Sequence, residues 1–394
     1  MRVLASTPNP ALLTLPWATP LADWTEHVVP VPRGLSRHVV RVIHLDGSFY
    51  AIKETQEEIA KKEYRLLRDL GRRGLPAVAP VAVVSERPDD RGAALVTRHL
   101  AFALPYRTVF ANGLPAGGLP LLIDALVVLL VRLHLAGFYW GDVSLSNVLF
   151  RRSAGEFAAY LVDAETGELH PEVPTGMREY DVEVGCENVF AELLDVQEAD
   201  TSLAGHVDPF AVIERIRQQY VSLWDELTAE EQFGTDEVWR IEQRLARLGD
   251  LGFDVDELAM ATDPTSHTVS IQPRVVEAGH HARVLRDLTG LEVEDNQARR
   301  LLTDVASFAA YHALTDRAEV GRRWRQEIYD PIAATVPAAL RGRLEPAEVF
   351  HQILEHRWLL SERAGREIDI FETARDYVDT VLSRLPEERL TAPD

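Results

Sequence analysis

The sequence has almost no cysteine, since Cys186 is the only one among 394 residues. A single cysteine cannot form an intrachain disulfide, which excludes a disulfide-stapled secreted fold. The N-terminus also lacks a basic start followed by an apolar run and a small-residue cleavage site, so it predicts no export. We therefore expect a cytoplasmic protein.

The chain has no long uninterrupted apolar run. Its most apolar stretch, Leu119 to Trp140, is broken by Asp124, Arg132 and His134, whereas a membrane span needs roughly 18 to 20 predominantly apolar residues. This stretch predicts a buried helix and no membrane span.

Positively charged residues are fewer than negatively charged ones: the chain has 41 Lys and Arg and 62 Asp and Glu, for a net charge of −21. A chain this acidic repels nucleic-acid backbones and anionic bilayers, so we expect no nucleic-acid partner. The 46% hydrophobic content is that of an ordinary folded protein, and the length predicts two or three domains.

Lysine is scarcer still, because Lys53, Lys61 and Lys62 are the only lysines and every other cation is arginine. Lys61 and Lys62 lie in a charge-rich stretch where either cation would serve. Lys53 instead ends the apolar run Phe49–Ile52. A compact ammonium, which arginine cannot imitate, is indicated at position 53.

The first hundred residues predict a small antiparallel sheet with one helix. Residues 1–24 are interpreted as an arm lying on the fold, with a loosely ordered tail as the alternative. Asp46–Gly47 between two β-branched runs predicts a hairpin, and Gln56 to Leu70 has the spacing of an amphipathic helix. The predicted strands are His27–Val31, His38–Leu45, Ser48–Glu54, Val78–Val84 and Ala93–Thr97.

After Leu100 the pattern becomes mainly helical. We predict an N-terminal lobe over residues 25–100 and a helical lobe over 101–207, extended to 227 if Pro209 to Leu227 completes it. Residues 208–394 then form a mostly helical C-terminal module with one strand, Thr268 to Glu277. Its role in substrate selection, dimerisation or plain support stays open.

Four features occur in the order that phosphoryl transfer requires. The first is the segment Pro32–Arg37 between the first two strands, where backbone N–H groups near Gly34 and Ser36 can turn toward phosphates. An ordinary hairpin loop is the alternative. The second is Lys53 on the third strand with Glu63 ten residues later, on the apolar stripe of the helix. A solvated surface pair is the alternative.

The third feature is Trp140 to Phe150, which contains Asp142 and, five residues later, Asn147. An Asp on a loop can act as base at a substrate hydroxyl, and the Asn can offer an amide oxygen to a metal ion. The fourth is an apolar strand that ends in Asp163 and Glu165, hard oxygen ligands suited to magnesium. A simple turn is the alternative for each.

Together these residues resemble the bilobal protein-kinase-like superfamily, in its small atypical bacterial branches. Gly141-Asp142 is similar to the motif of aminoglycoside phosphotransferases and lipopolysaccharide-core kinases, and Asp142-x-Ser144-x-x-Asn147 to that of RIO-type kinases. The resemblance implies an α+β bilobal kinase-like fold, ATP and Mg²⁺ as cofactors, and a C-terminal domain of unknown function typical of high-GC Gram-positive bacteria.

The resemblance also implies residue roles. Lys53 would contact the nucleotide phosphates with Glu63 as its partner, Asp142 would be the catalytic base, and Asn147, Asp163 and Glu165 would hold the metal. The hinge that holds adenine would be His99, Leu100 and Ala101. The chain departs from the family pattern in its glycine-poor phosphate loop, in Trp140 where the family usually has His, in the missing cation at Ser144, and in Ala164-Glu165 after Asp163.

The sequence thus predicts an ATP- and Mg²⁺-dependent phosphotransferase acting on an alcohol group, with nucleotide as one substrate and an acceptor that is a small molecule, a sugar or lipid, or a protein. Two alternatives stay open: a pseudokinase that serves as a partner-binding platform, and transfer of AMP on the same fold. A homodimer or a protein partner would use residues 208–394.

Overall fold

The computed structural model describes residues 1–6, 9–31, 38–88, 92–112, 114, 117–199, 207–234, 237, 239–250, 253–263 and 268–390. The chain divides into two compact units. The first contains Met1–Arg151, Ala159–Tyr220 and Arg389–Asp394, and the second contains Arg152–Ala158 and Val221–Glu388. The division at Tyr220 lies between residues 207 and 227, the two ends considered for the helical lobe.

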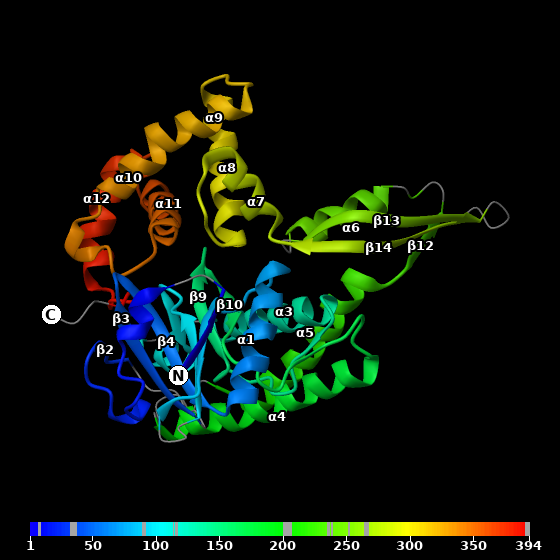
Figure 1. The fold of residues 1–394 in the computed structure, drawn as a ribbon. Helices are drawn as coiled ribbons and strands as arrows, with labels where there is room; N and C mark the ends of the chain where they lie inside the picture. Colours follow the sequence, from blue (N-terminus) through cyan, green and yellow to red (C-terminus); the bar gives the residue numbers. More distant parts are fainter. Residues whose placement is uncertain are drawn as a thin grey trace. The chain divides into compact units, whose positions relative to one another are not determined.

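A six-stranded antiparallel sheet with the strand order β1-β5-β6-β4-β3-β2 forms the first part of the first unit (Figure 1). The small antiparallel sheet predicted from the sequence is confirmed, and β1, which was not predicted, extends it at the β5 edge. The strands are β1 Arg2–Ala5, β2 Val28–Val29, β3 Val39–Leu45, β4 Ser48–Thr55, β5 Pro80–Ser85 and β6 Ala93–Arg98.

The β3–β4 hairpin turns where the sequence predicts it. Asp46 and Gly47 both have positive φ, 49° and 71°, which is the backbone of the turn that matches strand twist. The hairpin fixes a register in which Lys53 lies opposite Val40. Because side chains alternate along a strand, Lys53 and the buried Ile52 point to opposite faces of the sheet.

Residues 1–24 cover the sheet face that Ile52 occupies. Side chains of this segment form one hydrophobic cluster with those of the strands, and its buried members are Leu12, Leu15, Trp17, Leu21, Trp24, Ile43, Leu45, Tyr50, Ile52, Ala82, Val84, Ala94 and Val96. The buried Arg87 reinforces the contact by donating to the carbonyl oxygens of Trp17 and Thr19, each at 3.1 Å.

Helix α1, Glu57–Arg72, contacts β5 and β6. Its buried stripe contains Ala60, Tyr64, Leu67 and Leu70, and Glu63 lies on it with no exposed surface. A carboxylate in this position requires a cation. The fold therefore places Glu63 where it can meet a side chain from β4.

Helix α3, Gly118–Leu135, is long and apolar enough to span a membrane by composition alone, with a mean hydropathy of 2.0. In the structure 61% of this window is buried. Its polar residues also have protein partners: Asp124 pairs with Arg215 at 2.6 Å, and His134 lies 3.1 Å from Asp181. These contacts are those of a core helix.

The remaining elements as far as Thr228 are mainly helical, and three of them, β9, β10 and α5, continue into the second unit. The sequence did not predict the 25-residue helix α4. Polar residues on α4 hide its apolar period, so the pattern gave no signal. The elements are β7 Ala103–Pro105, α2 Tyr106–Ala111, β8 Phe138–Tyr139, β9 Val148–Ser153, β10 Glu156–Leu161, β11 Glu168–Leu169, α4 Thr175–Ala199 and α5 Pro209–Thr228.

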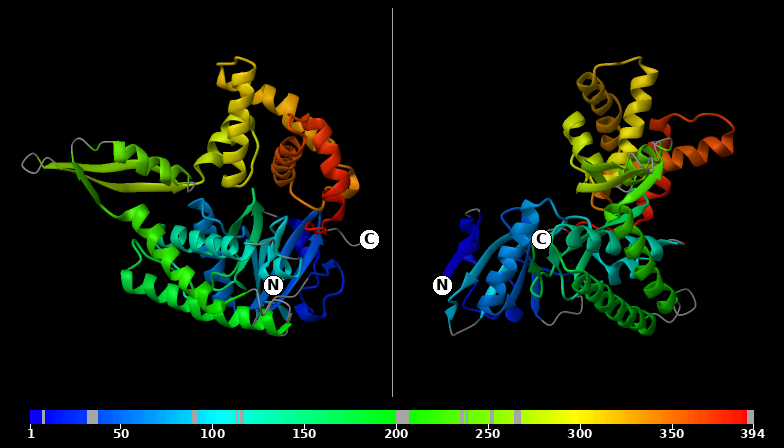
Figure 2. Two further views of the ribbon diagram at one scale, coloured as in Figure 1. Left: turned by 180° about the vertical axis from the view of Figure 1, so that it is seen from behind. Right: turned by 90° about the vertical axis from the view of Figure 1, so that its right-hand side faces the viewer.

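The second unit contains a helical core built around Trp324, Tyr329 and Phe350, whose ring centroids lie 5.3 to 5.8 Å apart. The prediction of a single strand here is wrong, since Thr268–Ala278 (β14) is the central strand of a three-stranded antiparallel sheet. Figure 2 shows its long β13–β14 hairpin from two sides. The other elements are β12 Glu231–Gly234, α6 Trp239–Asp250, β13 Phe253–Asp263, α7 His280–Thr289, α8 Asp295–Tyr311, α9 Arg317–Trp324, α10 Asp330–Ala334, α11 Pro346–Ala364 and α12 Ile370–Thr380.

The turn between β9 and β10 belongs to this second unit and is held by buried polar groups. The N–H of Ala154 donates to Glu348, which is 2% exposed, at 2.8 Å. Arg152 donates to Glu388 at 2.8 Å, and its carbonyl oxygen accepts from Gln297 at 3.1 Å. The turn is thus bonded to helices α8 and α11 and to the C-terminal segment.

Candidate active site

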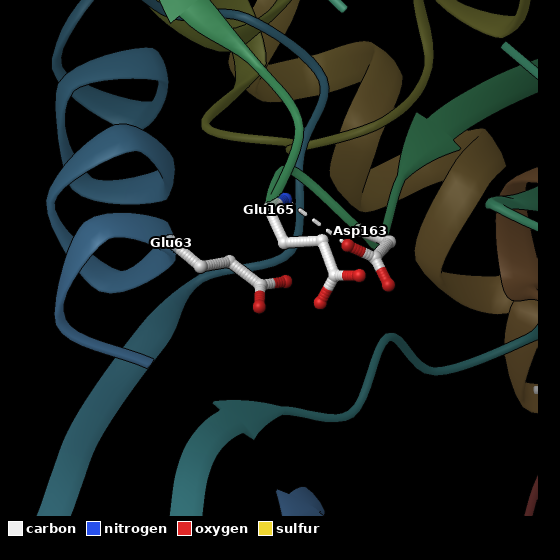
Figure 3. A group of neighbouring side chains, drawn as sticks. All are labelled: Glu63, Asp163 and Glu165. Atoms are coloured by element: carbon white, nitrogen blue, oxygen red, sulfur yellow. Dashed lines mark hydrogen bonds between the residues drawn. The ribbon is translucent and has the colours of Figure 1, made fainter. Parts of the chain in front are cut away.

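Lys53 is the centre of the candidate site. Its ammonium lies 2.9 Å from Glu63, 2.7 Å from Asp163 and 2.9 Å from Glu165, and its side chain is 12% exposed. The predicted pairing of Lys53 with Glu63 is present in the structure. Figure 3 shows Glu63 reaching from α1 toward Asp163 and Glu165, which follow β10.

Burial and charge act against each other in this cluster. Burial alone would lower the pKa of Lys53, but the carboxylates of Glu63 and Asp163 outweigh it and raise that pKa above its usual range. Burial raises the pKa of Glu63 to about 7, although Lys53 opposes the rise. Lys53 therefore stays an ammonium at neutral pH.

Glu165 contributes more contacts than a turn residue would. Its carboxylate lies 3.0 Å from His38, and its backbone carbonyl accepts from Lys62 at 2.9 Å. Burial would raise the pKa of Glu165, but Lys53 and His38 hold it below its usual value. Sequence reasoning missed His38 and Lys62, because nothing in a linear pattern shows that they meet residue 165.

Asp142 and Asn147 lie on one loop. The side-chain amide of Asn147 donates to the Asp142 carbonyl at 3.0 Å and to its carboxylate at 3.2 Å. The Asn147 carbonyl in turn accepts from the N–H of Val162 at 3.1 Å. Asn147 therefore lies beside the strand end that carries Asp163.

A buried network fixes the start of this loop. Asp181, which has no exposed surface, accepts from the N–H groups of Trp140 at 2.8 Å and Gly141 at 2.7 Å. His134 bridges Asp181 to the Tyr220 hydroxyl, with the second contact at 2.7 Å. Burial lowers the pKa of His134 despite the nearby carboxylate, so the network is built on a neutral imidazole.

The predicted phosphate-binding residues Gly34 and Ser36 lie outside the described residues. The predicted hinge residues His99, Leu100 and Ala101 follow β6, and the N–H of His99 bonds to the Phe49 carbonyl at 3.0 Å. Phe49 precedes Lys53 by four residues on β4, a distance of roughly 13 Å along a strand. The predicted hinge residues and Lys53 are thus connected through one strand, β4.

Comparisons with known proteins bear on both units. Residues 38–183 match the model of the lipopolysaccharide kinase (Kdo/WaaP) family, and residues 222–382 match that of a domain of unknown function, DUF4032. No curated protein matches the sequence.

Among solved structures, WaaP in complex with acyl carrier protein is 18% identical with a TM-score of 0.38, covering 64% of this chain and 98% of its own. The structure of the Rad53 kinase domain and SCD2 is 13% identical with a TM-score of 0.30, covering 39% and 59%. These two likenesses are too distant to bear on function. The residues gathered around Lys53 all fall within the family match. The resemblance to the protein-kinase-like superfamily is thus confirmed by the match of residues 38–183 to the lipopolysaccharide kinase (Kdo/WaaP) family model, and residues 222–382 match the model of DUF4032.

Proposed function

We propose that the first unit transfers the terminal phosphoryl group of ATP to an acceptor hydroxyl, with Mg²⁺ as the required ion. One observation carries the proposal: Lys53 is bonded to both Glu63 and Asp163, at 2.9 and 2.7 Å. This arrangement joins the sheet, helix α1 and the strand end after β10 around one ammonium. Such a group can neutralise phosphate charge when a nucleotide binds.

The donor set around Lys53 fits a magnesium ion. Oxygens of Glu63, Asp163 and Glu165 lie within 4.8 Å of one another, and three carboxylates exceed the charge of one ammonium. Hard, anionic oxygens are the ligands that Mg²⁺ takes. We propose Asp163, Glu165 and Asn147 as the magnesium ligands, while Glu63 stays paired with Lys53. Bound Mg²⁺ would screen the charge of the phosphate oxygens.

Asp142 is the proposed base. Its loop is fixed by the bonds to Asn147 and, through Trp140 and Gly141, to Asp181. A fixed carboxylate can accept the proton of an acceptor hydroxyl as the phosphoryl group is transferred, and positioning of this kind provides much of the catalysis of phosphoryl transfer. The family match favours a sugar or lipid hydroxyl as acceptor.

The test is a phosphorus NMR time course of the full chain with ATP and Mg²⁺, which needs no guess about the acceptor. We expect slow formation of ADP and phosphate by transfer to water. Asp142→Asn and Asp163→Ala should abolish it, because one removes the base and the other a metal ligand.

A matched control is Glu183→Gln. This change removes an exposed carboxylate on α4 that pairs with Arg217 on α5. It should turn over ATP like the parent. AMP and pyrophosphate as products would show that the protein transfers AMP and not a phosphoryl group. A flat trace together with unshifted ATP resonances on protein addition would contradict the proposal and favour the pseudokinase.

A further inference from the structure

Helix α4 presents one stripe of residues to the loop that carries Asp142. The spacing is i, i+4, i+7 and i+11, which keeps residues on one helix face. The stripe consists of Asp181, Gly185, Asn188 and Glu192.

The two ends of the stripe hold the two ends of the loop. Asp181 accepts from the N–H groups of both residues before Asp142. Glu192, which is 8% exposed, accepts from the N–H groups of Leu145 and Ser146, each at 2.8 Å. Four backbone N–H groups of the loop are thus bonded to carboxylates of one helix.

Gly185 lets the helix approach the loop closely. A Cβ atom at this position would lie 2.9 Å from Cγ1 of Val143, closer than carbon atoms pack. Glycine is unfavourable inside a helix, so its presence in α4 is explained by this contact. The approach brings the next residue of the stripe within reach of Asp142.

That residue, Asn188, donates from its amide to the Val143 carbonyl at 2.9 Å and to Oδ1 of Asp142 at 3.3 Å. Asn147 donates to the other oxygen, Oδ2, at 3.2 Å. Each carboxylate oxygen of Asp142 therefore accepts from one amide. A carboxylate held on both oxygens cannot rotate freely about its side-chain bonds.

We propose that Asn188 is a positioning residue for Asp142, because its amide holds Oδ1 of the carboxylate and the neighbouring Val143 carbonyl. Ser144 is buried and accepts from the Asn147 N–H at 3.3 Å. Because the Asn188 amide is neutral, it orients the Asp142 carboxylate without neutralising the charge of that carboxylate. This inference rests on the proposed function, in which Asp142 is the base.

The test compares ATP turnover by the full chain carrying Asn188→Leu with turnover by the parent, at saturating and limiting ATP. Asn188→Leu removes both amide donors with little change in volume. We expect kcat to fall roughly 10- to 100-fold, because a misplaced base loses the benefit of orientation. The KM for ATP should change less than about twofold, because Asn188 serves the base and not the nucleotide.

The matched control is Gln197→Leu on the same helix. Gln197 also donates its amide to a backbone carbonyl, that of Val207 at 2.6 Å, which lies outside the Asp142 loop. It should leave kcat unchanged while lowering the melting temperature as much as Asn188→Leu does. If Asn188→Leu does not fold, Asn188→Ser, whose hydroxyl is too short to reach Oδ1, gives the same comparison.

The outcomes separate this inference from the proposed function. A parent with no ATP turnover and with unshifted ATP resonances on protein addition contradicts the proposed function, and the inference falls with it. A parent that turns over ATP while Asn188→Leu matches it in kcat overturns the positioning role alone. An equal loss of kcat in Gln197→Leu would also overturn the positioning role, because it would show that the stability of α4 sets kcat.

Discussion

The indole N–H of Trp140 donates a hydrogen bond to the carbonyl oxygen of Asp163, at 3.2 Å. Trp140 occupies the position, two residues before Asp142, where related kinases usually have a histidine. Its side chain has no exposed surface. The tryptophan therefore ties the loop of the proposed base to the strand end that carries the proposed metal ligands.

Trp140→Phe removes this donor and a part of a fully buried ring. We expect a stability loss of about 2 kcal/mol and a fall in ATP turnover, because the two halves of the site lose a direct bond. The control is Trp24→Phe, whose indole donates to the Thr19 carbonyl at 3.1 Å in the N-terminal segment. Denaturant unfolding should show similar losses for the two variants, while turnover falls only for Trp140→Phe.

Lys53→Arg keeps the positive charge but replaces a compact ammonium by a planar, larger group. Three carboxylates surround Lys53 at 2.7 to 2.9 Å, so a guanidinium cannot take the same place. We expect ATP turnover to fall by roughly 100-fold, an effect typical of a displaced charge in an active site. Lys61→Arg, at the solvent-facing pair with Glu57, should be neutral. Equal activity of both variants would contradict the inference, drawn from the scarcity of lysine, that position 53 requires a compact ammonium.

His99 should make the protein sensitive to acid. Burial lowers the pKa of His99 to about 4, against an ordinary value of about 6.5. The unfolded chain then binds a proton that the folded chain does not, so the stabilising effect present above pH 6.5 is lost as the pH falls toward 4. At pH 5 this loss is about 2 kcal/mol.

His99→Phe should therefore lose less stability between pH 7 and pH 5 than the parent, as measured by chemical denaturation at both values. The exposed His27, which has a φ of 63°, provides the control His27→Asn, since asparagine tolerates that conformation. A pH dependence unchanged in His99→Phe would show that other groups cause the acid sensitivity.

Leu12 and Leu13 test the role of the N-terminal segment. Leu12 is 1% exposed and belongs to the cluster on the sheet, whereas Leu13 is 57% exposed. Leu12→Ala should lower the free energy of unfolding by about 2 to 5 kcal/mol, and Leu13→Ala by less than about 0.5 kcal/mol. Equal effects would mean that the segment does not pack on the sheet in solution.

The β3–β4 hairpin and helix α1 could be predicted because each has its own chemical signal. Asp46–Gly47 adopts the turn that its dipeptide favours, and α1 follows the period of its apolar residues. The pairing of Lys53 with Glu63 could be predicted for a related reason. A carboxylate on an apolar helix stripe needs a cation, and Lys53 was the lysine that could not be explained as a surface residue.

Elements whose polar residues contact other segments were harder to predict from the sequence. Helix α4 carries Asp181, Asn188 and Glu192 toward the Asp142 loop, so its buried side is partly polar and its apolar period is weak. The strands around β14 were missed for a related reason: β13 mixes acidic and apolar residues without a clear alternation.

The kinds of residue at the site and their order along the chain could be interpreted from local patterns, because turn chemistry, alternation and helical spacing act between near neighbours. The contacts between distant groups became apparent from the packed structure. Glu165 meets His38 and Lys53, and Asn188 meets Asp142 across 46 residues. Such contacts depend on how sheet, helices and loops pack in three dimensions, and no local pattern encodes them.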